Sequence, residues 1–220
     1  MFLDVTADAV LRICANSING LSNRYGGRGE RDGDPRYQEL LVLMREAQNQ
    51  GDLVLFSENA QDQAVKLGLR QTSDVAAEAR NRRIANLLGL DGITGEFNVV
   101  YGVRPLSHKE IAIQSRSMMQ VLIDLGSYID VPARDITEGR VFVAPRNDQL
   151  DRLFPALLRV HTSESAPQDA HVAVRYRNGW FYIDDRDHES KAAFNFLMLL
   201  FSLTETGMTQ AAPIVTVPAR

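Results

Sequence analysis

Residues 170–203, AHVAVRYRNGWFYIDDRDHESKAAFNFLMLLFSL, decide the fold that the sequence predicts. They contain a β-hairpin, an acidic corner and a strongly apolar helix, in that order. Asn178 and Gly179 separate a segment rich in Val and Tyr from an aromatic one. Asn-Gly is the preferred pair for a two-residue type I′ turn, because both residues tolerate positive φ. We therefore predict a hairpin that turns at Asn178-Gly179.

The predicted hairpin has one face that combines arginine with aromatic rings. In this register Arg177 lies opposite Trp180, and Arg175 lies opposite Tyr182. One interpretation is a stacking surface for nucleic acid or a partner protein. The other is a solvated sheet face on which arginine stems cover the rings. Both stay open, and the candidate binding residues are Arg175, Arg177, Trp180 and Tyr182.

The acidic corner, residues 184–191 (DDRDHESK), is the densest ionisable cluster in the chain. Part of it has a structural explanation, because Asp185 or Asp187 can cap the following helix and Glu189 suits the positive end of its dipole. The alternative is a divalent-cation site for Mg²⁺ or Mn²⁺, in which a lysine stabilises an attacking or leaving oxygen. The candidate metal ligands are Asp184, Asp185, Asp187 and Glu189, and the candidate catalytic residues are Asp184, Asp185, Asp187 and Lys191.

Two families bear on this corner. Glu189-Ser190-Lys191 has the E-x-K spacing of the PD-(D/E)xK nucleases, but the acids are adjacent here and E-x-K opens a helix. The segment RYRNGWFYIDDRD (175–187), with Ser190-Lys191 and the apolar helix, resembles the C-terminal stretch of an uncharacterised bacterial protein family. That second resemblance implies no function. It implies only that the acidic corner is a family trait.

The helix predicted over residues 189–204 is apolar nearly all round, which predicts burial on most of its sides. Its apolar run is too short to span a bilayer, which takes about 20 residues. We expect it to be the central core helix, and the alternative is a helix whose burial is completed by a second subunit.

Composition limits the class of protein. The 220 residues are 45% hydrophobic, which is enough for a core, and carry a formal net charge of −4. This acidic balance argues against a general nucleic-acid binder. The single cysteine, Cys14, excludes an internal disulfide and fits a reducing compartment. We expect a cytoplasmic, bacterial protein without a membrane segment.

The rest of the chain is predicted mainly from helix caps and apolar periodicity. Asp34-Pro35 and Thr72-Ser73-Asp74 begin two helices, and Ser107 with Glu110 has the capping-box spacing of a long third one. The predicted helices are 6–21, 34–50, 60–69, 72–88 and 107–129, and the predicted strands are 52–56, 97–103, 141–143, 157–162 and 213–218.

These patterns predict an α+β protein, with a mostly helical N-terminal part packed on a small antiparallel sheet and a buried C-terminal helix. We expect one domain, 1–220, in which residues 1–135 could form a helical subdomain and residues 136–220 a hairpin and helix subdomain. The expected function is an interaction or assembly module of a larger bacterial complex, without catalysis or cofactor of its own, that binds a protein partner or itself.

Two alternative functions stay open. One is a metal-dependent, nuclease- or phosphodiesterase-like enzyme that acts on phosphate-containing substrates through residues 184–191. The other is small-ligand sensing beside the face of arginine and aromatic residues. The sequence does not decide whether the chain is an enzyme.

Overall fold

The computed structural model describes residues 7–25, 33–57, 64–141, 143 and 156–206. The fold is α+β, as predicted. The helices are α1 (Ala7–Cys14), α2 (Pro35–Asn49), α3 (Val75–Leu88), α4 (Met118–Gly126), α5 (Ala133–Thr137) and α7 (His188–Thr206). The strands are β1 (Ala15–Ile18), β2 (Leu21–Ser22), β3 (Leu53–Phe56), β4 (Val65–Leu69), β5 (Gly95–Tyr101), β6 (Glu110–Ser115), β7 (His161–Ser163), β8 (Ala170–Tyr176) and β9 (Gly179–Asp184).

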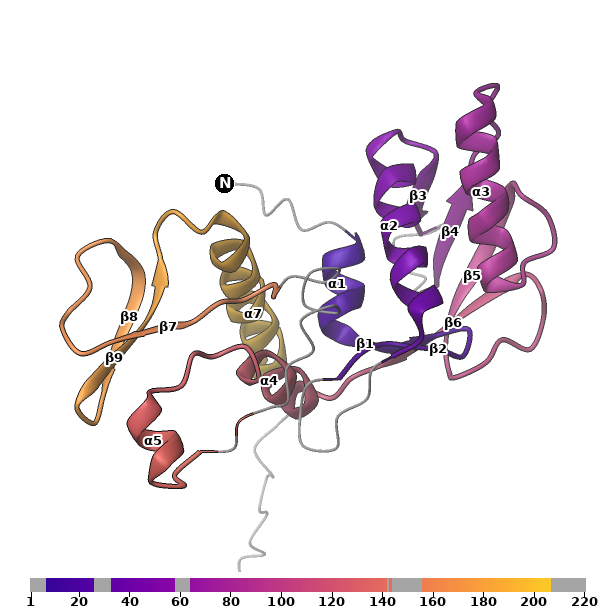
Figure 1. Ribbon diagram of the computed structural model, residues 1–220. Coiled ribbons are helices and arrows are strands. Elements are labelled where there is room, and N and C mark those ends of the chain that lie inside the picture. The colour runs from indigo at the N-terminus through magenta and orange to yellow at the C-terminus, as the bar shows by residue number, and fades with distance from the viewer. Residues whose placement is uncertain (1–6, 26–32, 58–63, 142, 144–155, 207–220) are drawn as a thin grey trace, which may run out of the picture.

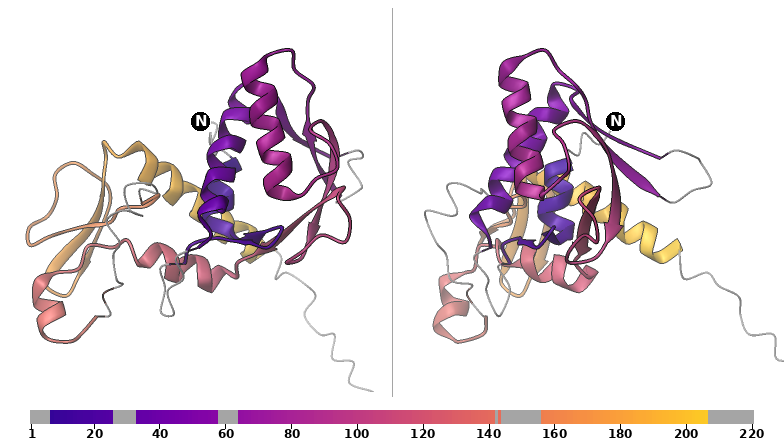
Figure 2. Two further views of the ribbon diagram at one scale, coloured as in Figure 1. Left: turned by 45° about the vertical axis from the view of Figure 1, so that its right-hand side comes forward. Right: turned by 90° about the vertical axis from the view of Figure 1, so that its right-hand side faces the viewer.

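The larger lobe is built on a six-stranded mixed sheet with the strand order β2-β1-β6-β5-β4-β3. Only the pair β5 and β6 is parallel. α2 and α3 lie side by side over one face of this sheet (Figure 1, Figure 2). Their apolar sides form one core with the inward residues of the strands, and its fully buried large side chains include Tyr37, Leu40, Ile84 and Phe97.

The smaller lobe holds the antiparallel sheet β7-β9-β8. A second apolar core joins β9, α7 and α4, and Ile13 of α1 belongs to it. Leu11, also on α1, packs against the first core instead. α1 therefore lies between the two lobes and contributes side chains to both cores (Figure 1).

Two of the predicted helix caps form as expected. Asp34 caps α2, with its side chain accepting from the backbone N–H of Arg36, and Pro35 occupies the first turn. Asp74 caps α3 in the same way, through the N–H of Ala76. Because an N-cap side chain bonds within its own turn, the signal is local in the chain. The helices predicted over 34–50 and 72–88 are confirmed.

Three predicted helices are wrong in whole or in part, because a strand occupies part of each span. Residues 6–21 form α1 and then turn into β1, and the described part of 60–69 contains β4. The long helix over 107–129 is instead β6 followed by α4. Its true capping box is formed by Ser117 and Gln120, not by Ser107 and Glu110. The N-terminal part thus carries a six-stranded sheet that we did not predict.

The predicted strands over 52–56 and 97–103 are confirmed as β3 and β5, with shifted ends. The one over 157–162 is wrong for most of its length, since β7 begins at His161. Val141 and Val143 lie outside any strand, while Phe142 and the strand predicted over 213–218 lie outside the described residues.

The hairpin of β8 and β9 forms, but its turn is one residue earlier than predicted. Tyr176 pairs with Gly179, so Arg177 and Asn178 form the turn and Arg177 takes a φ of 53°. Arg175 therefore faces Trp180, and the predicted pairings of Arg177 with Trp180 and of Arg175 with Tyr182 are wrong.

A second Asn-Gly pair makes the turn that the sequence rule describes. Asn19 and Gly20 have φ values of 46° and 81° and connect β1 to β2. The Asn19 side chain also donates to the carbonyl oxygen of Leu88 (2.6 Å) and accepts from the N–H of Ala112 (2.6 Å). This turn therefore links the end of α3 to β6 as well as joining two strands.

Candidate functional site

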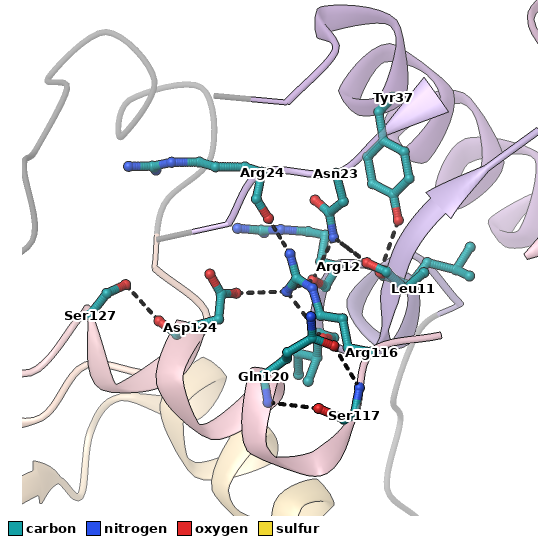
Figure 3. Close-up of polar contacts among 12 residues, drawn as sticks. Leu11, Arg12, Asn23, Arg24, Tyr37, Arg116, Ser117, Gln120, Asp124 and Ser127 are labelled. Carbon is teal, nitrogen blue, oxygen red and sulfur yellow. Dashed lines mark hydrogen bonds and ion pairs between the residues drawn. The ribbon is translucent and has the colours of Figure 1, made fainter. Parts of the chain in front are cut away.

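The candidate site lies at the C-terminal end of α1, where side chains from distant segments meet (Figure 3). The last carbonyl groups of a helix have no partner within it. Here Tyr37 donates its hydroxyl to the carbonyl of Leu11 (2.9 Å), and Asn23 donates to those of Arg12 (2.9 Å) and Ala15 (2.8 Å). The end of α1 is thus capped by side chains from other segments.

Arg116 lies at the centre of this group of side chains, which we call the Arg116 cluster and which also contains Asn23, Tyr37 and Asp124. Its guanidinium donates to the carbonyls of Arg12 and Ile13, each at 3.2 Å, and to the carbonyl of Arg24. The same group binds the carboxylate of Asp124 at 2.8 Å. A cation at the C-terminal end of a helix is favoured by the helix dipole. Because only 1% of the Arg116 side chain is exposed, these bonds form away from bulk water.

Two short elements hold Arg116 in place. It follows β6 directly, and its own backbone N–H donates to the carbonyl of Cys14 (2.6 Å). Ser117 then caps α4 and accepts from the N–H of Gln120, whose side chain bonds back to the Ser117 N–H. One turn further, α4 presents Asp124 to Arg116 (Figure 3).

Burial also affects the other titratable groups of the cluster. It lowers the pKa of Arg12, against the attraction of Tyr128 and Asp8. It raises the pKa of the Cys14 thiol, although the charge of Arg116 opposes that shift. Cys14 is therefore held as a neutral thiol, as expected for a small packed side chain.

None of the cluster residues was among the predicted site residues. Arg116 and its partner carbonyls at Arg12 and Arg24 are 104 and 92 positions apart in the chain. No spacing rule connects residues at such separations. The local signals near the cluster were the S-x-x-Q pattern at Ser117 and the Asn-Gly turn after β1, which predict the start of α4 and the β1–β2 turn but not the contact of Arg116 with α1.

The acidic corner is divided among separate partners. Asp184 accepts from the backbone N–H of Arg186 (2.8 Å), and Asp185 pairs with Lys191 (2.8 Å). The Lys191 interaction holds the pKa of Asp185 below its usual value. Asp187 instead faces Ser190, and Glu189 lies in the first turn of α7. No three of these acids are grouped so that they could hold a metal ion.

Asp187 is the N-cap of α7. One of its carboxylate oxygens accepts from the Ser190 N–H (3.0 Å) and the other from the Ser190 hydroxyl (2.7 Å). The same hydroxyl accepts from the N–H of Arg159 (2.8 Å), and Ser190 is almost fully buried. The structure therefore supports the capping interpretation for Asp187.

We expect Asp187→Ala to lower the free energy of unfolding by about 1 kcal/mol, the usual loss for an N-cap. Urea denaturation at pH 7 measures it. Asp185→Ala is the matched control, because it removes only an exposed ion pair and should change stability by less than about 0.5 kcal/mol. Equal effects of the two substitutions would contradict the capping role.

The Asp187 contribution should also depend on pH. Burial raises the pKa of Asp187, but the hydrogen bonds from Ser190 and the charge of Arg159 outweigh burial and hold the pKa below its usual value. A carboxyl whose pKa is lower in the folded state than in the unfolded state stabilises the folded state. This contribution is complete at pH values above the pKa of the unfolded state, which is about 3.9 for Asp. The difference between wild type and Asp187→Ala should therefore shrink as the pH falls below about 4. A difference that stayed constant down to pH 2 would contradict this linkage.

The predicted face of arginine and aromatic residues is brought together in part. Arg175, Trp180 and Tyr182 share one face of the small sheet, and the His161 ring lies 5.6 Å from that of Tyr182. Arg177 lies in the turn, where its guanidinium is 5.1 Å from the Tyr176 ring and 3.4 Å from Asp135. A pocket of about 870 Å³ lies beside the hairpin turn, and its lining includes Arg177 but not Arg175, Trp180 or Tyr182.

Within the described residues, no three His, Cys, Asp or Glu side chains are grouped so that they could hold a metal ion. No helix in the same part of the chain is long and apolar enough to cross a membrane. Comparisons of the chain with known protein families, with curated proteins and with solved structures find no match.

Proposed function

We propose that this chain is an interaction or assembly module that associates with a second copy of itself. The observation that carries the proposal is a change of exposure along α7, from buried positions in its first half to exposed apolar side chains near its C-terminal end. Ser190, Ala193, Phe196 and Leu197 are buried against the small lobe, whereas Leu199 and Leu203 are 44% and 61% exposed. The prediction that α7 is buried on most of its sides is therefore wrong.

α4 adds a second exposed apolar surface. Met119, Leu122 and Ile123 occupy one side of this helix, opposite the side that carries Asp124. Residues at spacings of three and four share a helix face, so the three side chains lie together. In Figure 2 the C-terminal end of α7 projects beyond α4 and the rest of the molecule. We call Met119, Leu122, Ile123, Met198, Leu199 and Leu203 the apolar surface.

The composition of the apolar surface favours self-association over a transient partner. Its six side chains are all Leu, Ile or Met, and charged residues are depleted at the centre of interfaces. Interfaces between identical subunits are more apolar than those of transient complexes. Exposed apolar patches larger than a few hundred Å² are uncommon on monomeric proteins and mark interaction sites.

The decisive experiment is sedimentation of the purified chain over a concentration series. We expect the weight-average mass of the wild type to rise above that of one 24.5 kDa chain by about 100 μM, which corresponds to a weak to moderate affinity. Leu199→Glu/Leu203→Glu should remain monomeric, because two charges then lie in the contact.

Val42→Glu is the matched control, since Val42 is 53% exposed on α2, away from the apolar surface. It should associate like the wild type. A wild type that stays monomeric over the whole series would overturn the proposal, as would a double variant that associates normally.

The metal-dependent enzyme receives no comparable support. Its candidate residues bind separate partners, and Lys191 is engaged by Asp185. Calorimetric titration with Mg²⁺ or Mn²⁺ would test it directly, and saturable binding that Asp185→Ala abolishes would reopen it.

A further inference from the structure

A small pocket opens beside the Arg116 cluster, and neither the capping of α1 nor the apolar surface uses it. Its polar lining includes Arg12 of α1, Arg24 after β2, Gln38 of α2, and Asp124 and Tyr128. The space that the pocket leaves for a water-sized group is about 20 Å³. About 10–15 Å³ is enough for one water, so the pocket has room for a small group and is far too small for a large metabolite.

The charged groups around the pocket favour an anion. The side chains of Arg12 and Arg24 extend in the same direction, on the side of Asp124 (Figure 3). Asp124 is the carboxylate in the lining, and Arg116 binds it at 2.8 Å. Asp8, whose charge reaches Arg12, is bound by Arg45. Each arginine carries five N–H donors, so Arg12 and Arg24 can bind an oxyanion in addition to their protein contacts.

Gln38 adds a second requirement. It is 7% exposed, and within the described part of the chain its Oε1 atom is buried without a hydrogen-bond partner. Buried polar atoms in folded proteins nearly always have a hydrogen-bond partner. A buried atom without a partner in the protein therefore suggests that a bound group supplies one. Because Oε1 is an acceptor, its partner must carry a hydrogen-bond donor.

We propose that this pocket binds free hydrogen phosphate. Arg12 and Arg24 donate to its charged oxygens, and the P–OH group donates to Oε1 of Gln38. Sulfate has the same charge and a similar size at pH 8 but no O–H. The methyl phosphate dianion, which stands for a phosphate ester, lacks the O–H as well. The pocket therefore distinguishes free phosphate from both.

Titration followed by amide NMR tests this inference, because the side-chain NH₂ of Gln38 and the Nε–H groups of the arginines report from the pocket itself. At pH 8 we expect saturable shifts of these signals with inorganic phosphate. We also expect at least about tenfold weaker binding of sulfate and methyl phosphate, the effect of one hydrogen bond to a charged group.

Two variants separate binding from folding. Arg24→Gln keeps the backbone carbonyl that Arg116 uses but should weaken phosphate binding by about tenfold or more. Gln38→Met, of similar length and shape, should bind phosphate and sulfate equally. Arg82→Gln, on the exposed side of α3, is the control and should bind phosphate like the wild type.

Three results would overturn the inference. The first is the absence of shifts at about 20 mM phosphate, which would mean that any affinity is very weak. The second is an equal affinity of the wild type for phosphate and sulfate. The third is an equal loss of phosphate affinity in Arg24→Gln and Arg82→Gln. The third would show binding by general surface charge.

Discussion

Arg116→Met is expected to destabilise the protein by about 3–5 kcal/mol, the usual loss when one partner of a buried ion pair is removed. The substitution leaves the Asp124 carboxylate buried without its cation and removes the donor from the carbonyls of Arg12, Ile13 and Arg24. Urea denaturation with circular dichroism measures the loss.

Two further variants make this expectation specific. Arg116→Met/Asp124→Leu should recover part of the stability, because the buried ion pair is then replaced by apolar side chains, but not all of it, because the carbonyls of Ile13 and Arg24 have lost the donor that Arg116 supplies. Arg82→Ala removes an exposed arginine from a pair with Glu78 and should cost less than about 1 kcal/mol. An Arg116 variant as stable as Arg82→Ala would show that the cluster contributes little to folding.

Phe196→Ala is the second change with a large expected effect, again about 3–5 kcal/mol. Phe196 is 9% exposed and belongs to the core that joins α7 to α4 and β9. Truncation removes apolar contact area and leaves a cavity that the surrounding helices and strands fill only in part.

Leu199→Ala, three residues further along α7, is the matched comparison. Its side chain is 44% exposed, so its loss should change the stability of the monomer by less than about 1 kcal/mol. Thermal unfolding at low protein concentration, where association is absent, compares the two variants. Similar losses in both would mean that α7 is buried all round and would remove the basis of the proposed self-association.

Local chemistry explains why parts of the fold were predictable. The caps Asp34, Asp74 and Asp187 bond to backbone groups two or three residues away, so the pattern and the structure are contained in one turn. The acidic corner was identified for the same reason. Its interpretation as a metal site required the acids to converge, and convergence depends on the path of the chain beyond that turn.

The failures have a different physical cause. Residues 110–115 contain apolar residues at spacings that suit either a helix or a strand, and the choice depends on whether neighbouring strands supply hydrogen bonds. β6 lies between β5 and β1 in the sheet, and both of these strands form backbone hydrogen bonds with it. The one-residue shift of the β8–β9 turn has a similar origin, because β7 pairs with β9 on its other edge and contributes to its register.

The sequence by itself determined an α+β chain, the helix starts at Asp34 and Asp74, and an apolar helix that follows the acidic corner, because each rests on contacts within one turn or on composition. Only the tertiary structure decided that β6 is a strand, that α7 leaves Leu199 and Leu203 exposed, and that Arg116 meets the end of α1. The β1–β6 pairing and the contacts of Arg116 join segments about a hundred positions apart, so they form only when distant parts of the chain come together.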